Sequence, residues 1–441
     1  MKQFRYQSLI LGIALLFMAN IALAQNPLIY EQFSADPTAR VFEGIMYVYP
    51  SHDIPVPPGS GARANWFCME DYHVYSSENL VDWTDHGVIL SQTTVPWVNN
   101  NAYSMWAPDC VYKNGKYYFY FPAMNRIGVA VADKPYGPFK PEDQSIQGIR
   151  GGIDPCVLLD KDGSAYLFYS MNALFVAKLK DNMIELETQP QRIPNLPTQG
   201  LVEGPFAFER NGIYYLTYPH ATTTERLEYA TSSSPTGPFT VKGVIMDESP
   251  SGCWTNHHSI VEYKGQWYLF YHDKDLSPNF DKNRSIKADY LYFNDDGTIQ
   301  KVIPTHRGVG ISDAKKEIQI DRYSEISKEG VSVDYLDPNV TKKGWKTTLS
   351  NNDSWIRYNK VDFGQEKLKS VIAKALSESG SSVEIRIDSL DGQLIAKVEI
   401  PKSTDWSDIK ADVSGNATGV HDLFVIHKDA NPASIDWVKF E

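Results

Sequence analysis

The stretch that decides the fold is "LVEGPFAFERNGIYYLTY", residues 201–218. After its glycine at position 212, aromatic side chains alternate in direction, a pattern typical of a half-buried β-strand that follows a tight turn. The same pattern recurs along the chain, as "GIMYVYP" from Gly44, "GKYYFYF" from Gly115, "GSAYLFY" from Gly163, "GIYYLTY" from Gly212 and "GQWYLFY" from Gly265. Five similar units of roughly fifty residues predict an all-β fold, a five-bladed β-propeller with one four-stranded sheet per blade.

A second recurrence lies upstream of each of these glycines. The residue eight or nine positions earlier is, in chain order, Asp36, Trp106, Asp154, Glu203 and His257. In a propeller, the strand that precedes such a hairpin is normally the innermost and starts at the mouth of the central channel. Asp before Pro is also common in ordinary turns, so each residue alone could be a local turn or cap residue. Five residues in one register favour convergence of three carboxylates, an indole and an imidazole.

These positions carry motifs that resemble glycoside hydrolase family 43, whose members are five-bladed propellers that cleave pentose-containing plant polysaccharides. The resemblance covers roughly residues 26–312, which we take as the propeller domain. The motifs are "ADP" at Asp36, "YPSHD" ending at Asp53, "WAPD" at Trp106, "GGIDP" at Asp154, "EGP" at Glu203 and "HHS" at His257.

The resemblance implies catalytic roles for three carboxylates. Asp36 matches the general base, Glu203 matches the general acid, and Asp154 matches the carboxylate that orients the acid and tunes its pKa. The chemistry fits, because glycosidic cleavage needs one protonated carboxyl for the leaving oxygen and one ionised carboxylate to activate water. A third acid beside Glu203 would help to keep it protonated near neutral pH. The family inverts the anomeric centre, which requires about 6.5–9.5 Å between the two acids.

Other residues are assigned to substrate binding. Trp106 resembles an aromatic wall of the first sugar subsite, and Arg284 matches a basic group that contacts the sugar and the carboxylates. The motif at Asp53 suggests a closed pocket, which would read one terminal sugar. Phe206 replaces a His that many xylosidases of this family carry after "EGP", so the leaving-group subsite differs from theirs. His257 matches the axial His that lies by a central ion, often calcium, or an ordered water cluster.

The character of the sequence changes after residue 312. Residues 313–441 show short alternating strands, as in "SSVEIRIDS" and "QLIAKVEI" with "LDGQ" as a turn between them, which predicts a β-sandwich or jelly roll. This segment resembles a carbohydrate-binding module of family 6. The resemblance implies a structural calcium site at Gln319, Asp321 and Asp436. The Gln319 and Asp321 side chains replace the usual Glu pair, which should weaken binding of a hard cation.

The usual sugar clamp of such a module is incomplete in this chain. Trp406 matches one aromatic platform, but the opposing position is Leu349, and Ser434 stands where an Asn is expected. A structural domain packed on the propeller and a working sugar binder therefore both remain open.

Composition restricts the classes of partner. A chain of 441 residues is long enough for two domains. Its net charge of −12 makes nucleic acid and anionic membranes poor candidates. Residues 1–24 read as a signal peptide, with Lys2 and Arg5 before an apolar run that ends in a small-residue site at Ala24, so we expect export to the periplasm or the medium. An uncleaved membrane anchor is the alternative for this segment.

The four cysteines, Cys68, Cys110, Cys156 and Cys253, fit no metal-binding motif and are read as buried thiols or one incidental disulfide.

The functional prediction is an exo-acting, inverting hydrolase that removes terminal pentose from hemicellulose, with xylan or arabinoxylan fragments as substrates. A β-1,4-xylosidase is favoured. The alternatives are an α-L-arabinofuranosidase, another exo-glycosidase such as a galactan-active one, and a catalytically inactive sugar-binding propeller. The last is disfavoured because a lectin would not need an acid pair. The chemistry needs no cofactor, and the resemblance allows a structural calcium ion.

Overall fold

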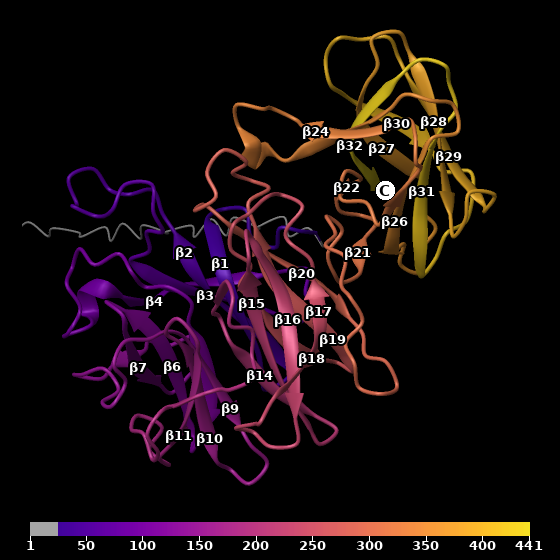
Figure 1. Cartoon of the computed structure of the whole chain (residues 1–441). Coiled ribbons are helices and arrows are strands. Elements are labelled where there is room, and N and C mark those ends of the chain that lie inside the picture. The colour runs from indigo at the N-terminus through magenta and orange to yellow at the C-terminus, as the bar shows by residue number, and fades with distance from the viewer. Residues whose placement is uncertain (1–24) are drawn as a thin grey trace, which may run out of the picture.

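The computed structural model describes residues 25–441, whose regular secondary structure is almost entirely β-strand (Figure 1). In this part of the chain the helical elements are two short 3-10 turns, Gln92–Thr94 and Thr341–Lys343. The predicted signal peptide lies outside the described residues. Within those residues, no helix has the length and apolar character needed to cross a membrane.

The first part of the chain forms five separate antiparallel sheets, which confirms the predicted five-bladed propeller. Three of them have the predicted four strands, the fourth has five strands, and the fifth has three. Their strands are β1 (Phe33–Phe42), β2 (Ile45–Asp53), β3 (Asp71–Ser77) and β4 (Thr84–Ser91); β5 (Asp109–Lys113), β6 (Lys116–Ala123), β7 (Arg126–Ala132) and β8 (Lys140–Pro141); β9 (Ile153–Leu159), β10 (Ala165–Ser170), β11 (Leu174–Leu179) and β12 (Gln191–Arg192); β13 (Leu201–Val202), β14 (Phe206–Arg210), β15 (Ile213–Ala221), β16 (Glu225–Ser232) and β17 (Thr240–Met246); and β18 (Ser259–Tyr263), β19 (Gln266–Asp273) and β20 (Ser285–Leu291).

The repeated glycines close the hairpins between the two inner strands of each blade. All five have φ between 78° and 85°, which glycine adopts without strain. In four of the hairpins the residue before the glycine is also left-handed, as in a type I′ turn: Glu43, Asn114, Asn211 and Lys264. The strands that precede these hairpins, β1, β5, β9, β14 and β18, each contact the next one, and β18 contacts β1 again. They therefore form the closed inner ring of the propeller.

The N-terminal segment closes the ring by covering the three-stranded fifth blade. The amide of Leu28 donates to the carbonyl of Ile286 at 2.8 Å, which places this segment along the outer edge of β20. The buried side chain of Asn26 donates to the carbonyls of Ala288 at 3.0 Å and Thr305 at 2.8 Å. Residues far apart in sequence thus complete the last blade together.

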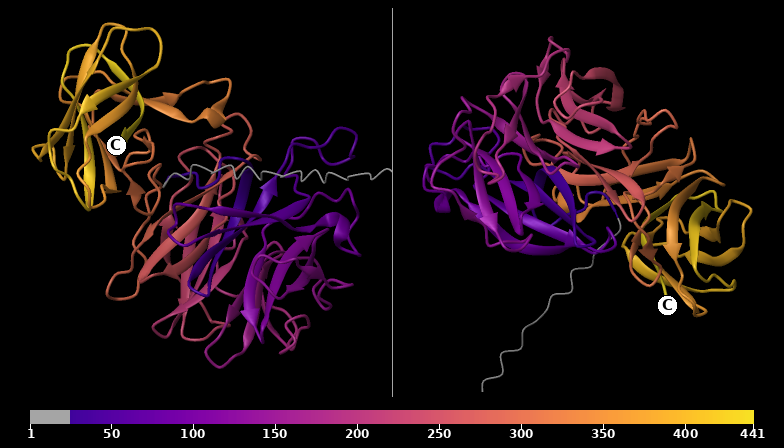
Figure 2. Two further views of the ribbon diagram at one scale, coloured as in Figure 1. Left: turned by 180° about the vertical axis from the view of Figure 1, so that it is seen from behind. Right: turned by 90° about the horizontal axis from the view of Figure 1, so that it is seen from below.

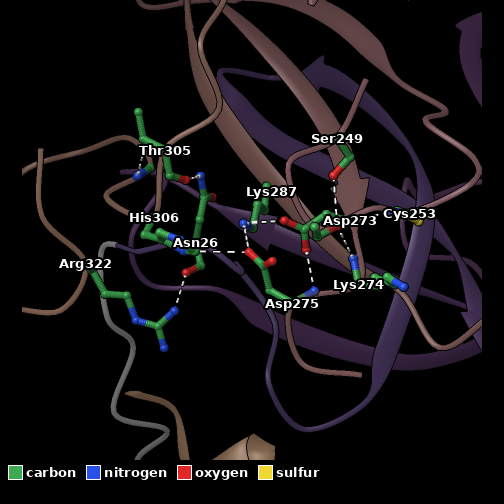
Figure 3. A network of polar contacts seen from close by, with 12 residues as sticks. Asn26, Ser249, Cys253, Asp273, Lys274, Asp275, Lys287, Thr305, His306 and Arg322 are labelled. Atoms are coloured by element: carbon green, nitrogen blue, oxygen red, sulfur yellow. Dashed lines mark hydrogen bonds and ion pairs between the residues drawn. The ribbon is translucent and has the colours of Figure 1, made fainter. Parts of the chain in front are cut away.

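A buried ion cluster lies beside this closure (Figure 3). The ammonium group of Lys287, on β20, is paired with the carboxylates of both Asp273 and Asp275. Burial alone would lower the pKa of Lys287, but the two carboxylates hold that pKa above its usual range. The cluster therefore contains a charged lysine that cannot be solvated by water.

In the second part of the chain, two mostly antiparallel sheets pack around one apolar core, which confirms the predicted β-sandwich. One sheet has the order β21-β26-β31-β28-β29 with β23 beside β26, and the other β24-β25-β32-β27-β30 with β22 beside β32. Their strands are β21 (Ser312–Asp313), β22 (Ile318–Gln319), β23 (Glu325–Ile326), β24 (Val331–Tyr335), β25 (Trp345–Leu349), β26 (Trp355–Asp362), β27 (Ser370–Leu376), β28 (Ser381–Ile387), β29 (Leu394–Ile400), β30 (Ser407–Asp412), β31 (Val420–His427) and β32 (Ala433–Phe440).

The sandwich lies against one side of the propeller (Figure 2). Thr341 donates to the carbonyl of Leu276 at 2.6 Å, and Arg322 donates to the carbonyl of Asn26 at 2.7 Å. The phenol of Tyr335 donates to the carbonyl of Asp275 in the loop that holds the lysine cluster. The sandwich therefore contacts the same region where the propeller closes. The four cysteines all lie in the propeller, where they are buried free thiols.

We predict that Lys287→Met destabilises the protein by about 3–5 kcal/mol, because it leaves two carboxylates buried without their cation. The measurement is the free energy of unfolding in denaturant. Lys301→Met is the matched control, since Lys301 and its partner Asp247 are about half exposed and should contribute little. Equal effects of the two substitutions would contradict this account of the closure.

Candidate active site

Two of the predicted carboxylates start inner strands in the same unusual backbone conformation. Asp36 on β1 has φ 49°, and Asp154 on β9 has φ 54°. A register shift interrupts the pairing of β1 with β2 between Ala35 and Thr38, and a similar shift affects β9. Left-handed non-glycine residues and bulges cost energy, and they re-aim a side chain at a strand end. Both carboxylates are buried, with relative exposures of 5% each.

Arg284, just before β20, binds two carboxylates from the first blade. Its Nη1 and Nη2 atoms lie 2.8 Å and 3.2 Å from the two oxygens of Asp36. Its Nε and Nη2 atoms each lie 2.9 Å from an oxygen of Asp53. The planar guanidinium group suits such paired contacts. Arg284 therefore joins the last blade to the first at the entrance of the inner ring.

The surroundings of Asp36 favour its ionised form. Burial alone would raise the pKa of Asp36, but Arg284, together with smaller contributions from its other neighbours, holds that pKa below its usual range. Ser51 donates a further hydrogen bond of 2.6 Å to the Asp36 carboxylate. The backbone amide of Asp36 donates to Nδ1 of His272 at 3.0 Å. Because this ring nitrogen accepts a hydrogen bond, His272 is neutral, in keeping with the effect of burial, which lowers its pKa.

Glu203 has the opposite electrostatic environment. It lies between β13 and β14, and its pKa is raised well above the usual range by burial and then by the carboxyl group of Glu225. Glu225, at the start of β16, is 1% exposed and accepts a 2.7 Å hydrogen bond from the amide of Asn256. The carboxyl groups of Glu203 and Glu225 are close neighbours, and they could share a hydrogen bond only with a proton on one of them. Burial raises the pKa of Glu225 to about 7.

Asp154 completes a group of five carboxyls, with Asp36, Asp53, Glu203 and Glu225, at the site of one arginine. It accepts a 3.2 Å hydrogen bond from the amide of Gly204, next to Glu203. Burial raises the pKa of Asp154, and Glu203 and Asp36 raise it further. For Glu203, however, Glu225 is the stronger neighbour. Sequence reasoning missed Glu225, since it begins a strand outside the inner ring and no repeated motif marks it.

The other predicted substrate residues have different surroundings. Trp106 is half-buried, and its indole N–H has no hydrogen-bond acceptor among the described residues. Phe206 is only 2% exposed and packs in the core below Arg40, whose guanidinium lies 4.9 Å from its ring centre. The carboxylate of Asp53 is fully engaged by Arg284. The ring of His257 lies so close to Gly204 that a β-carbon there would be 3.0 Å away.

Two aromatic residues at the entrance were not found from the sequence. Phe67 covers Arg284, whose guanidinium carbon is 4.8 Å from the centre of its ring. Trp254 stacks on Phe67 with 6.1 Å between ring centres. Both side chains are half-buried, so part of each surface faces solvent. They lie in loops without a repeat, "NWFCM" and "SGCWT", which explains why the pattern did not reveal them.

The predicted calcium ligands do not form a compact cluster of acids or imidazoles among residues 25–441. Burial lowers the pKa of His257 to about 4, so its ring is neutral and could serve as a ligand. In the sandwich, Asp321 is buried next to Arg322, with 2.8 Å between Oδ2 and Nε, so a cation there would compete with a guanidinium. Burial, Asp321 and Glu317 raise the pKa of Asp436 to about 7. Gln319 lies on β22, and its backbone carbonyl accepts a hydrogen bond from the side-chain amide of Gln25.

In the predicted sugar clamp of the sandwich, Trp406 is half-buried, whereas Leu349 is fully buried in the core. Ser434 lies 2.9 Å from the hydroxyl of Thr348. Leu349 therefore offers no surface to stack on a sugar.

Comparison with known proteins now decides the family. The model of glycosyl hydrolases family 43 matches residues 24–299, and that of the family 6 carbohydrate-binding module matches residues 326–441. The chain belongs to glycosyl hydrolase family 43. It is therefore a glycoside hydrolase with a carbohydrate-binding-module-like second domain.

Relatives fall into two groups. "Xylosidase/arabinosidase 43A" of Humicola insolens is 38% identical over 62% of this chain and 98% of its own length. "Arabinoxylan arabinofuranohydrolase" of Bacillus subtilis is 29% identical, over 91% of this chain and 88% of its own length. The first group is more similar in sequence, and the second spans both domains.

Solved structures show the same division. A family 43 β-xylosidase/α-arabinofuranosidase from a compost metagenome, in complex with xylotriose and in a calcium-free form, is 37% identical with a TM-score of 0.57 and covers 64% of this chain and 98% of its own. An arabinoxylan arabinofuranohydrolase from Bacillus subtilis, in complex with cellotetraose, is 28% identical with a TM-score of 0.59 and covers 95% of this chain and 98% of its own.

Proposed function

We propose that this glycoside hydrolase is an exo-acting, inverting β-1,4-xylosidase that removes terminal xylose from hemicellulose fragments. One observation carries the proposal: two carboxyls at one entrance have pKa values displaced in opposite directions, below the usual range for Asp36 and above it for Glu203. Such a displaced pair identifies the base and the acid of a hydrolase. α-L-Arabinofuranosidase activity is the second candidate.

Asp36 is the general base in this proposal. Its ionised carboxylate takes a proton from the water that attacks the anomeric carbon. The contacts from Arg284 and Ser51 hold the carboxylate in place and keep it charged in a buried site. Because the water enters on the face opposite the leaving group, the product has the inverted configuration.

Glu203 is the general acid and donates a proton to the leaving glycosidic oxygen. Glu225 supports this role, because a shared hydrogen bond and a nearby negative charge keep a proton on the pair. Asp154 adds a further negative charge and holds the amide of Gly204, which orients the loop of the acid. Asp53 acts through Arg284 rather than on the sugar.

The preference for xylose rests on sequence similarity to known xylosidases and on the aromatic side chains at the entrance. The relatives called xylosidase/arabinosidase and β-xylosidase are 35–38% identical over the propeller, more than the two-domain arabinofuranohydrolases. Trp106, Phe67 and Trp254 offer aromatic surface that a sugar ring can stack on. The second candidate is supported by the two-domain relatives, which share the sandwich of this chain.

We further propose export of the chain, with residues 1–24 removed as a signal peptide. Where calcium is present, His257 would be its ligand at the propeller axis, whereas Gln319, Asp321 and Asp436 in the sandwich fit a second ion poorly, because Arg322 already pairs with Asp321. The ion would act on structure, since the acid and the base are both supplied by carboxyl groups.

Glu203→Gln and Asp36→Asn should each lower kcat/KM by about 10²–10⁴-fold, the usual cost of losing a general acid or base. The assay compares an aryl xyloside with xylobiose. Glu203→Gln should spare the aryl substrate in part, because nitrophenolate leaves without a proton, whereas Asp36→Asn should lower both rates alike. Unchanged melting temperatures serve as the control for folding. More than half of the wild-type rate on xylobiose in either variant would exclude the role assigned to that residue.

Glu225→Gln should lower the pKa of Glu203, because it removes the neighbouring carboxylate that resists ionisation. Since Glu203 must be protonated to act, the basic limb of the pH profile of kcat/KM should move to lower pH. Asp154→Asn should move it in the same direction. Glu228→Gln is the matched control on the same strand, since Glu228 is buried but paired with Arg226 and His220. A basic limb that stays in place in Glu225→Gln would refute the coupling.

The enzyme should prefer 4-nitrophenyl β-D-xylopyranoside to the α-L-arabinofuranoside, by about tenfold in kcat/KM if one polar group is left unpaired by the wrong sugar. Linear xylan digests should release xylose without longer intermediates. A clear preference for the arabinofuranoside would select the second candidate and keep the catalytic residues. Random mid-chain products would contradict exo action.

A further inference from the structure

Three metal-ligand side chains gather on the outer side of the first blade. His52 is near the end of β2, and Asp71 and His73 are on β3. β2 and β3 are antiparallel with Val48 opposite Tyr75, and the same register brings His52 opposite Asp71 at the strand ends. Side chains two residues apart point to one face, so His73 lies beside Asp71. One ligand atom from each residue lies within 4.8 Å of the others.

The direct contacts bring the groups close to coordination geometry. Nδ1 of His52 is 2.7 Å from Oδ1 of Asp71, and the two imidazole ring centres are 5.2 Å apart. All three side chains are partly accessible, with exposures of 19% for His52, 15% for Asp71 and 14% for His73. An ion can therefore reach them from solvent without unfolding the blade.

Asp85 on β4 supplies an independent sign of a metal site. Its two oxygens lie 3.0 Å and 3.1 Å from Nδ1 of His73, and Oδ1 also accepts from the amide of Gly87 at 2.7 Å. A carboxylate that accepts from Nδ1–H fixes the tautomer in which Nε2 carries a free lone pair. Metal-bound histidines are normally oriented in this way.

We propose that His52, Asp71 and His73 bind one divalent ion of the zinc type, with Asp85 as the group that orients His73. Two imidazoles and one carboxylate suit zinc and its neighbours, whereas calcium prefers six to eight oxygen ligands. The ion would replace the direct contact between His52 and Asp71, and each neutral imidazole would keep its one proton on the ring nitrogen that does not bind the ion.

An ion bound at His52, Asp71 and His73 would lie close to the residues that hold Arg284 in the active site. His52 is followed by Asp53, whose carboxylate holds Arg284. A bound ion would cross-link β2 to β3 next to this contact and stabilise the folded state. The ligands themselves face away from Asp36, because alternate residues of β2 point to opposite faces: Ser51 and Asp53 contact the site, and His52 does not.

The test is titration of the chelator-treated protein with ZnCl₂ by calorimetry. We expect about one equivalent bound with a micromolar or lower Kd, and a higher melting temperature with zinc than without it. His52→Gln and His73→Gln should each weaken zinc binding at least tenfold. Asp85→Asn should weaken it by no more than about 100-fold, because Asp85 orients His73 and does not touch the ion.

His421→Gln is the matched control, because His421 forms a similar 2.8 Å contact with Asp388 but belongs to no three-ligand group among the described residues. It should bind zinc as the wild type does. Melting temperatures without metal show whether each variant is folded. Less than half an equivalent in the wild type, unchanged affinity in folded His52→Gln and His73→Gln, or equal competition by CaCl₂ would each overturn the proposal.

Discussion

The arrangement of the active site depends on one buried arginine. The side chain of Arg284 contacts Asp36 and Asp53 of the first blade, while its backbone lies just before β20 of the fifth blade. A charge that is removed from water is tolerated only when it is paired and hydrogen-bonded, and here the pairing uses both edges of the guanidinium group. The same contact lies where the ring closes, so the closure of the propeller and the charge state of Asp36 are linked.

One arginine cannot neutralise five carboxyls, because Asp36 and Asp53 already occupy its guanidinium group. Asp36 takes the favourable contacts and stays ionised, while Asp154, Glu203 and Glu225 are buried close together without a cation of their own. Like charges in a site of low polarity raise each other's pKa, so protons remain on this group near neutral pH. The site thus provides the ionised carboxylate and the protonated carboxyl that the proposed base and acid require.

Much of the fold could be predicted because the propeller repeats its own signals. The glycines at positions 44, 115, 163, 212 and 265 adopt left-handed turns, and the inner strands that precede these turns contact one another in a ring. Features that occur once have no such signal. Glu225, Phe67 and Trp254 reach the site from strands and loops that differ between blades, and His272, rather than His257, accepts from the amide of Asp36. Phe206 follows the "EGP" motif but packs into the core, because the first three residues of β14 are all buried there.

Neutron diffraction from a crystal of the ligand-free enzyme near pH 7 would test the central claim most directly, since it locates deuterium on individual carboxyl oxygens. The account predicts no deuterium on either oxygen of Asp36, deuterium on all five N–H positions of Arg284, and a deuterium shared between Glu203 and Glu225. Deuterium on Asp36, or an ionised Glu203 and Glu225 without a proton between them, would contradict it.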